Sequence, residues 1–159
     1  MSDSARIAQL VTSQQADLEW QQDFYEDLHR HPELSHEEER TAGRIRAKLA
    51  DFDCEVVENI GGYGMVAIFR NGDGPTALLR ADFDGLPVEE ATGVSYSAAN
   101  GNMHACGHDM HTAVMVGTAL TLAVLVAIAP ASATTSGRDI RASIAYSGVA
   151  QELLGCASR

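Results

Sequence analysis

Basic residues are scarce in this chain, and their scarcity excludes two classes of partner. The sequence has 11 Lys and Arg residues against 22 Asp and Glu residues, which gives a formal net charge of −11. Nucleic acids and anionic membranes bind clusters of Lys and Arg, so we expect neither as a partner. The length of 159 residues fits a single domain, which buries about two-thirds of the surface of its unfolded chain.

Cysteine is scarce as well, and its pattern bears on the cellular compartment. The three cysteines are Cys54, Cys106 and Cys156. Their odd number and long spacings exclude a disulfide framework and favour a reducing compartment. The first residues lack the basic segment and apolar run of a secretory signal peptide. We therefore expect a cytoplasmic protein.

Charged residues are absent from one long segment, residues 112–137, of which residues 114–131 are mostly apolar. Hydropathy alone makes this a marginal membrane span. The segment has no aromatic belt and no Lys or Arg on its N-terminal side, which disfavours that interpretation. We predict instead a core helix from about Met110 to Ala127, ended by Pro130, with a membrane anchor over residues 112–131 as the alternative.

The preceding part of the chain predicts an alternation of helices and strands. An amphipathic pattern predicts a helix over residues 16–30. Ser35 and Glu38 form a capping-box pattern for a second helix, which runs to about Leu49 and turns Ala42, Ile45 and Leu49 inward. The pattern further predicts strands over residues 54–60, 65–69 and 76–80, a turn at Gly61–Gly62, and a hairpin-type turn over residues 71–75.

Two carboxylates follow the third predicted strand. This strand is almost continuously apolar, which predicts burial on both faces. Asp82 and Asp84 alternate with Phe83, so both carboxylates point to one side if the strand continues. The carboxyl end of a buried strand is where open α/β sheets bind ligands. An ordinary turn is the equally weighted alternative, because Asp84–Gly85 is also typical turn chemistry.

The densest group of metal-competent side chains lies in residues 103–111, which read Met-His-Ala-Cys-Gly-His-Asp-Met-His. Cys106 and His108 can direct a thiolate and an imidazole at one point, because Gly107 between them tolerates unusual backbone angles. Asp109 is the expected N-cap of the helix that follows. A lone Cys-x-His pair is weak evidence, and a packed cysteine beside a hydrogen-bonded histidine is the alternative.

Three further histidines, His29, His31 and His36, surround the junction between the two predicted helices. Many carboxylates lie nearby, so a metal site is one interpretation. We favour solvated or capping histidines near helix ends.

Three motifs, taken together, carry a family resemblance. They are His-Arg-His-Pro-Glu-Leu-Ser at residues 29–35 with Glu38, Leu-Arg-Ala-Asp-Phe-Asp-Gly-Leu-Pro at 79–87, and the segment 103–111. In this order and spacing they resemble the N-terminal part of metal-dependent amidohydrolases of the aminoacylase and carboxypeptidase superfamily. The most similar branch holds hippurate hydrolases, N-acyl-amino-acid amidohydrolases and auxin-conjugate hydrolases. The resemblance covers residues 16–127.

The resemblance implies an α/β fold, an incomplete metallopeptidase-type catalytic domain in which helices flank a mixed sheet, without the family's lid and dimerisation domain. It implies hydrolysis of the amide bond of N-acyl amino acids with two divalent metal ions, Zn or else Mn, Co or Ni. By position, Cys106 and His108 match metal ligands, and Asp84 matches the acidic residue that orients the catalytic groups. Asp82 stands where the carboxypeptidase branch has a ligand histidine, a role that Cys106 can replace. His111 belongs to the motif without a ligand role.

The family's general base has no counterpart in this sequence. In the family a Glu-Glu pair follows the helix, and later histidines complete the ligand set. Here Gln151–Glu152 is followed by Leu-Leu, which we do not assign to that motif, and no histidine follows His111.

Composition also changes after about Ala129. We therefore predict the N-terminal part of a catalytic domain over residues 1–129 and an aberrant or poorly ordered tail over 130–159, from a shifted reading frame or a truncated gene. We expect negligible hydrolase activity from the chain alone. A non-catalytic metal-binding module, or one completed by a partner, is the alternative.

Overall fold

A computed structural model describes residues 19–70, 76–128 and 141–145 of the chain, together with residues 5, 8, 9 and 12. Its named elements within those residues are α2 (Glu19–Arg30), α3 (Glu39–Leu49), β1 (Glu55–Ile60), β2 (Gly64–Ile68), β3 (Thr76–Arg80), α4 (His108–Ile128) and β4 (Arg141–Ala145). The predicted α/β class is confirmed. Wherever the chain is described, the ends of each predicted helix and strand agree within two residues, except that α3 begins three residues after the start that a cap at Ser35 predicts.

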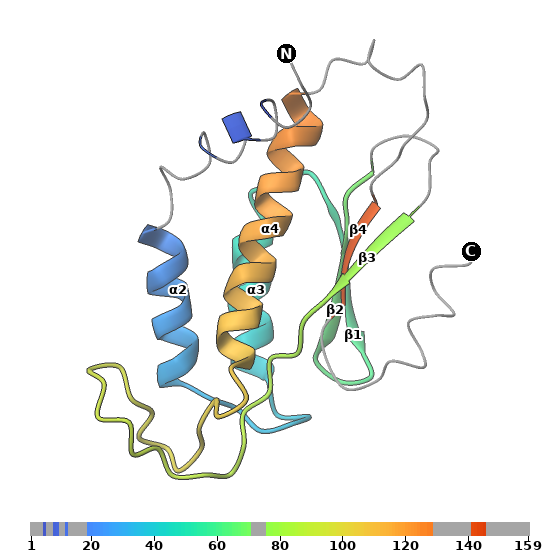
Figure 1. Cartoon of the computed structure of the whole chain (residues 1–159). Coiled ribbons are helices and arrows are strands. Elements are labelled where there is room, and N and C mark those ends of the chain that lie inside the picture. The colour runs from blue at the N-terminus through green and yellow to red at the C-terminus, as the bar shows by residue number, and fades with distance from the viewer. Residues whose placement is uncertain are drawn as a thin grey trace.

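The four strands form one mixed sheet in the order β1-β2-β4-β3 (Figure 1). β2 pairs antiparallel with β1 and with β4, whereas β3 and β4 run parallel. The turn between β1 and β2 contains Gly61 and Gly62 at φ angles of 63° and 118°, a backbone conformation that glycine adopts without strain. The hairpin-type turn predicted over residues 71–75 lies outside the described residues. β2 and β3 are not neighbours, because β4 lies between them.

The prediction that β3 is buried on both faces is wrong. Leu78 is 46% exposed, although its neighbour Leu79 packs against the core. The three named helices lie on one side of the sheet (Figure 1), and β3 is at the end of the described strand order. The continuous apolar sequence of β3 therefore does not mean that helices cover both faces of the sheet at this strand.

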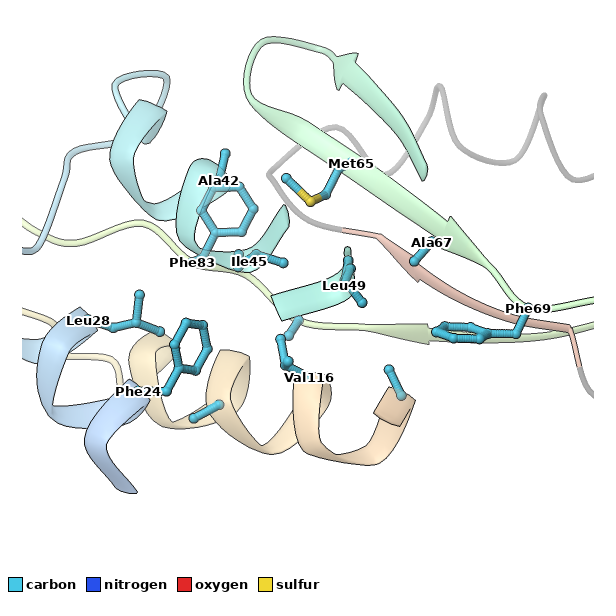
Figure 2. Packing of buried hydrophobic residues seen from close by; sticks show 13 residues of the cluster. Phe24, Leu28, Ala42, Ile45, Leu49, Met65, Ala67, Phe69, Phe83 and Val116 are labelled. Atoms are coloured by element: carbon cyan, nitrogen blue, oxygen red, sulfur yellow. The ribbon is translucent and has the colours of Figure 1, made fainter. Parts of the chain in front are cut away.

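The core lies between the sheet and the helices (Figure 2). Alternate residues of β2 and the residue that follows it, Met65, Ala67 and Phe69, are almost fully buried and face the helices. The inward residues predicted for α3 are confirmed, because Ala42, Ile45 and Leu49 are at most 8% exposed.

Helix α4, which carries no charged residue from Thr112 onward, contributes Val116 and Ala119 to the same core, both at 0% exposure. Its described residues therefore behave as the predicted core helix. Among the described residues, no helix combines the length and the apolar character needed to cross a membrane.

The capping box predicted for α3 is wrong. The residue before the helix is Glu38, and its side chain makes no capping hydrogen bond. The backbone N–H groups of Arg40 and Thr41 donate instead to the two carboxylate oxygens of Glu33, at 2.9 and 2.7 Å. A carboxylate stabilises a helix N-terminus, because it accepts from unpaired N–H groups and opposes the helix dipole. The tertiary fold, and not the local sequence pattern, brings the Glu33 carboxylate to the N-terminus of α3.

Replacing Glu33 with glutamine is expected to lower the free energy of unfolding by about 1–2 kcal/mol. The amide keeps one accepting oxygen and loses the charge, so one of the two N–H groups is left without its charged partner. Urea unfolding measures the change. The matched control is Glu37→Gln, at an exposed position in the same segment, which should shift stability by no more than about 0.5 kcal/mol. An equal loss in both variants would contradict the capping role of Glu33.

The predicted division at residue 129 remains a prediction. Most of residues 130–159 lie outside the described residues. Within that segment the structure describes β4, Arg141–Ala145, which pairs with β2 and with β3.

Candidate metal centre

The three sequence motifs meet at the carboxyl end of β3. The N–H of Gly85 donates to the carbonyl of Glu33 at 2.6 Å, and Leu34 and Gly85 form a parallel bridge. Leu86 and Met103 exchange two backbone hydrogen bonds of 2.9 Å each. Backbone pairing therefore places residues that are up to 52 positions apart beside one another. It also holds the segment that carries Asp84 against the loop that carries Cys106.

Gly85 sits in a space that admits no larger residue. A Cβ added there would lie 2.9 Å from Cβ of Pro32, 3.3 Å from the carbonyl oxygen of Glu33 and 3.4 Å from that of Met103. Two of these three atoms belong to the backbone, which cannot rotate away as the tip of a long side chain can. The three motifs approach this closely because glycine stands at their crossing point.

Substitution Gly85→Ala is therefore expected to lower the free energy of unfolding by about 2 kcal/mol. The control is Gly43→Ala in the interior of α3, where nothing lies within 4 Å of the added Cβ. Alanine favours a helix interior over glycine, so this control should raise stability by up to about 1 kcal/mol. Opposite signs in chemical denaturation would confirm the crowding, and a stabilising Gly85→Ala would contradict it.

Asp84 contacts the histidine of the metal motif. Its carboxylate Oδ1 lies 2.8 Å from Nδ1 of His108, and its carbonyl oxygen lies 3.1 Å from the same atom. Both oxygens accept, so Nδ1 carries the hydrogen, and Nε2 keeps a lone pair for a metal ion. This contact is the one that an orienting role for Asp84 requires. That role, and ligation by His108, stay predictions.

Cys106 lies on an exposed turn immediately before α4 and is a free cysteine. Gly107 adopts a φ of 73°, and its N–H donates to the carbonyl of His104 at 3.0 Å. The unusual backbone angle expected of this glycine is therefore confirmed. Asp109 lies in the first turn of α4 and not at its N-cap, because the helix already begins at His108.

The described residues supply only some of the ligands that a metal site needs. No group of three or more His, Cys, Asp or Glu side chains among them is arranged to hold an ion. The carboxylate of Asp82 pairs with Arg80 at 2.6 Å, so the geometry lends no support to a ligand role for it. His111 stacks beside His108, with ring centroids 6.3 Å apart. Cys106 and His108 thus remain the candidate ligands, as two members of a larger set.

Our interpretation of His29 as a solvated or capping residue is wrong. It is 8% exposed, with Nδ1 at 2.6 Å from Oδ2 of Asp109 and Nε2 at 3.1 Å from Oε1 of Glu90. Both ring nitrogens are thus engaged by carboxylates, which leaves none for a metal. Burial by itself lowers the pKa of His29, but hydrogen bonds from its ring to Asp109 and Glu90 raise it above the ordinary 6.5.

The other two histidines of that junction lie nearer to solvent. Nδ1 of His31 lies 2.8 Å from the carbonyl of Asp27 near the end of α2, so the capping interpretation is confirmed for this residue. His36 is exposed and has a φ of 69°.

Glu90 anchors the loop between β3 and α4. Its side chain has no exposed surface. Its carboxylate accepts from the N–H of Ala98 at 2.6 Å and from the hydroxyl of Thr92. Burial raises the pKa of Glu90, but these hydrogen bonds and the one to His29 outweigh burial and lower the pKa to about 2. The carboxylate is therefore ionised at neutral pH.

His104 is a second buried histidine, at 5% exposure. Its Nδ1 lies 3.2 Å from the carbonyl of Asp84, the same oxygen that Nδ1 of His108 approaches. Within the described part of the chain, Nε2 of His104 has no hydrogen-bond partner. Burial lowers the pKa of this histidine.

Sequence reasoning assigned no role to Glu90 or His104. Glu90 lies in a polar loop, 61 positions from His29, and nothing in the local pattern marks it as buried. His104 belongs to the recognised motif, so its place in the cluster could have been suspected from its spacing to Cys106.

Residues 78–135 match the sequence profile of Peptidase family M20/M25/M40. An N-acetylcysteine deacetylase of Bacillus subtilis is 42% identical over 99 residues, which are 60% of this chain and 26% of that protein. A hippurate hydrolase of Campylobacter jejuni is 44% identical over 54% of this chain and 23% of that protein. We therefore identify residues 78–135 as part of an M20/M25/M40 family sequence. The chain spans about a quarter of the length of these two M20 relatives.

A relative with a different name aligns over a longer stretch. A Rhodococcus jostii protein named as a glutamate–cysteine ligase is 41% identical over 128 residues, or 76% of this chain and 16% of that protein.

Solved structures of M20 proteins share the fold of this chain. A crystal structure named for an aminohydrolase of methicillin-resistant Staphylococcus aureus aligns with a TM-score of 0.76 at 36% identity, over 87% of this chain and 34% of that one. The YXEP protein of Bacillus subtilis, described as a dinuclear metal-binding peptidase of the M20 family, aligns with a TM-score of 0.65 at 32% identity. That alignment covers 90% of this chain and 36% of the other. The mixed α/β unit therefore corresponds to part of M20 structures.

Proposed function

We propose that this chain forms the N-terminal part of the catalytic domain of a metal-dependent amidohydrolase that hydrolyses N-acyl amino acids. The observation that carries the proposal is the contact between the Asp84 carboxylate and Nδ1 of His108, 2.8 Å apart, two residues from the exposed Cys106. The names of two M20 relatives support the substrate class, because N-acetylcysteine and hippurate are both N-acyl amino acids.

Each of these residues has a defined part in the proposed chemistry. Cys106 and His108 would hold a divalent metal ion, and their sulfur and nitrogen donors suit zinc, with Mn, Co or Ni as further candidates. Such an ion, when bound, lowers the pKa of a coordinated water and polarises the scissile carbonyl. Asp84 accepts the Nδ1 hydrogen of His108, which fixes the ring's tautomer and leaves the lone pair of Nε2 for the ion. Met103 and Leu86 hold the two segments in register through their backbone pair.

The printed sequence by itself lacks the groups that would complete the reaction. Two donors cannot complete a two-metal site, and the family's Glu-Glu pair and later histidines have no assigned counterpart here. We therefore expect negligible hydrolysis of N-acetylcysteine or hippurate by the purified chain, with Zn²⁺ or Mn²⁺ added. Substantial metal-dependent cleavage would contradict this expectation.

A chimera tests whether the segment is a competent part of such an enzyme. Residues 19–128 would replace the matching segment of the Bacillus subtilis N-acetylcysteine deacetylase, which supplies the rest of its own catalytic machinery. We expect metal-dependent release of acetate, which Cys106→Ala in the chimera abolishes. A folded chimera that binds metal but hydrolyses nothing would contradict the proposal.

A non-catalytic metal-binding module, or one completed by a partner chain, is the second candidate. Cys106 and His108 supply two donors of such a site, so a partner chain would have to supply the remaining ligands. A partner that restores activity would carry the missing Glu-Glu pair and histidines. Metal binding by the chain without any such partner in its genomic neighbourhood would favour the module.

A further inference from the structure

One buried histidine connects three segments that meet at the candidate metal centre. His29 belongs to the last turn of α2, Glu90 to the loop after β3, and Asp109 to the first turn of α4. The two carboxylates lie at 2.6 and 3.1 Å from opposite nitrogens of the ring. The proposed ligation by Cys106 and His108 uses none of these three residues.

Each carboxylate that His29 engages holds a structure next to a candidate ligand. Asp109 follows His108 directly in the chain, and its Oδ1 lies 2.8 Å from the backbone N–H of Met110. The orientation of Asp109 therefore determines how the first turn of α4 presents His108. Glu90 ties down the loop through the N–H of Ala98, and Cys106 lies at the far end of that loop.

The surroundings of His29 leave little freedom for the ring. Tyr25 and Tyr96 pack against it, with ring centroids at 5.7 and 5.3 Å. Two buried carboxylates repel one another unless a donor stands between them. The imidazole supplies hydrogen bonds to both, so its loss would leave two charged groups in a site that solvent barely reaches.

We propose that His29 is a positioning residue of the candidate metal centre, which acts through Asp109 on His108 and through Glu90 on the loop of Cys106. This proposal rests on the proposed function, because it takes Cys106 and His108 as the metal ligands. The proposal predicts that substitution of His29 weakens metal binding. The loss of affinity should be greater than that caused by a substitution elsewhere in the core that lowers stability by the same amount.

The test compares three variants of the full chain with the wild type. His29→Gln removes the bridge, because a glutamine amide offers hydrogens from one nitrogen and not from two opposite ends. The matched control is His31→Gln, two positions away, where the ring is half-exposed and contacts a backbone carbonyl. Ile45→Ala is the stability control, since Ile45 is fully buried in α3 and contributes no atom to the bridge.

Two readouts separate positioning from general destabilisation. The first is titration with Co²⁺, followed by the near-ultraviolet absorption of a thiolate bound to cobalt. We expect the dissociation constant to rise about tenfold in His29→Gln and to stay within about twofold in both controls. The second is amide hydrogen exchange at Gly107 and His111, whose N–H groups close the turn. We expect exchange there about tenfold faster in His29→Gln, without a matching increase in β2.

The possible outcomes are as follows in their effect on the proposal. An equal rise of the dissociation constant in Ile45→Ala and His29→Gln would overturn the proposal, as would unchanged exchange at Gly107 and His111. If the wild-type chain binds no Co²⁺, its two candidate ligands do not hold the ion alone; hydrogen exchange then decides whether His29 positions the loop, and the chimera decides the proposed function. If His29→Gln does not fold, Glu90→Gln carries the same test. It keeps an accepting oxygen and loses the charge, so we expect about a threefold rise.

Discussion

Replacement of Cys106 by alanine is expected to raise the dissociation constant for Co²⁺ or Zn²⁺ at least about a hundredfold. A metal-bound cysteine is a thiolate, so the substitution removes an anionic sulfur from the candidate centre and leaves Nε2 of His108 as the other candidate donor. Loss of a hydrogen-bonding residue behind a ligand costs 10–100-fold in affinity by itself, and loss of the ligand costs more. Isothermal titration of the metal-free chain measures the constant.

Cys54→Ala is the matched control for this experiment. Cys54 is also free, and burial, with the nearby charge of Asp53, raises the pKa of its thiol. A thiol with a raised pKa is a poor metal ligand at neutral pH. Metal affinity should therefore stay within about twofold of the wild type. Equal losses in both variants, or unchanged binding in Cys106→Ala, would remove Cys106 from the ligand set.

The stabilising effect of the bridge between His29, Glu90 and Asp109 is expected to be largest between about pH 4.5 and 6.5. The pKa of Glu90 falls from its ordinary 4.5 to about 2, so its contribution is present above pH 4.5 and is lost as pH falls towards 2. The pKa of His29 is raised above 6.5. Its contribution is therefore present below pH 6.5 and is lost as pH rises through the raised value.

Denaturant unfolding of the wild type and of His29→Gln across pH 4–9 measures this effect as a difference in unfolding free energy. At pH 5.5 we expect the variant to be less stable by about 3 kcal/mol, because it leaves buried carboxylates without their cationic partner. The difference should shrink as pH rises above 6.5. A difference that is constant or grows with pH would show that His29 is neutral in the folded protein.

Local patterns predicted the secondary structure well because they depend on neighbours along the chain. The apolar spacing of α3 identified Ala42, Ile45 and Leu49 as inward residues, and all three are buried. The Gly61–Gly62 turn and the three strands before residue 80 also follow from local chemistry. The same local reasoning assigned the cap of α3 to Ser35 and Glu38, whereas Glu33 supplies it from seven and eight positions away.

The three motifs by themselves determined the family, the candidate ligands Cys106 and His108, and the neighbouring Asp84, because residue type and spacing carry that information. Only the tertiary structure showed that His29 is buried between two carboxylates. Its two carboxylate partners lie 61 and 80 positions away, and no periodicity predicts contacts at such separations. The exposure of β3 was likewise a tertiary outcome, since an apolar run is buried only where the fold supplies a layer to cover it. Polar residues are buried only when their partners arrive from elsewhere in the chain.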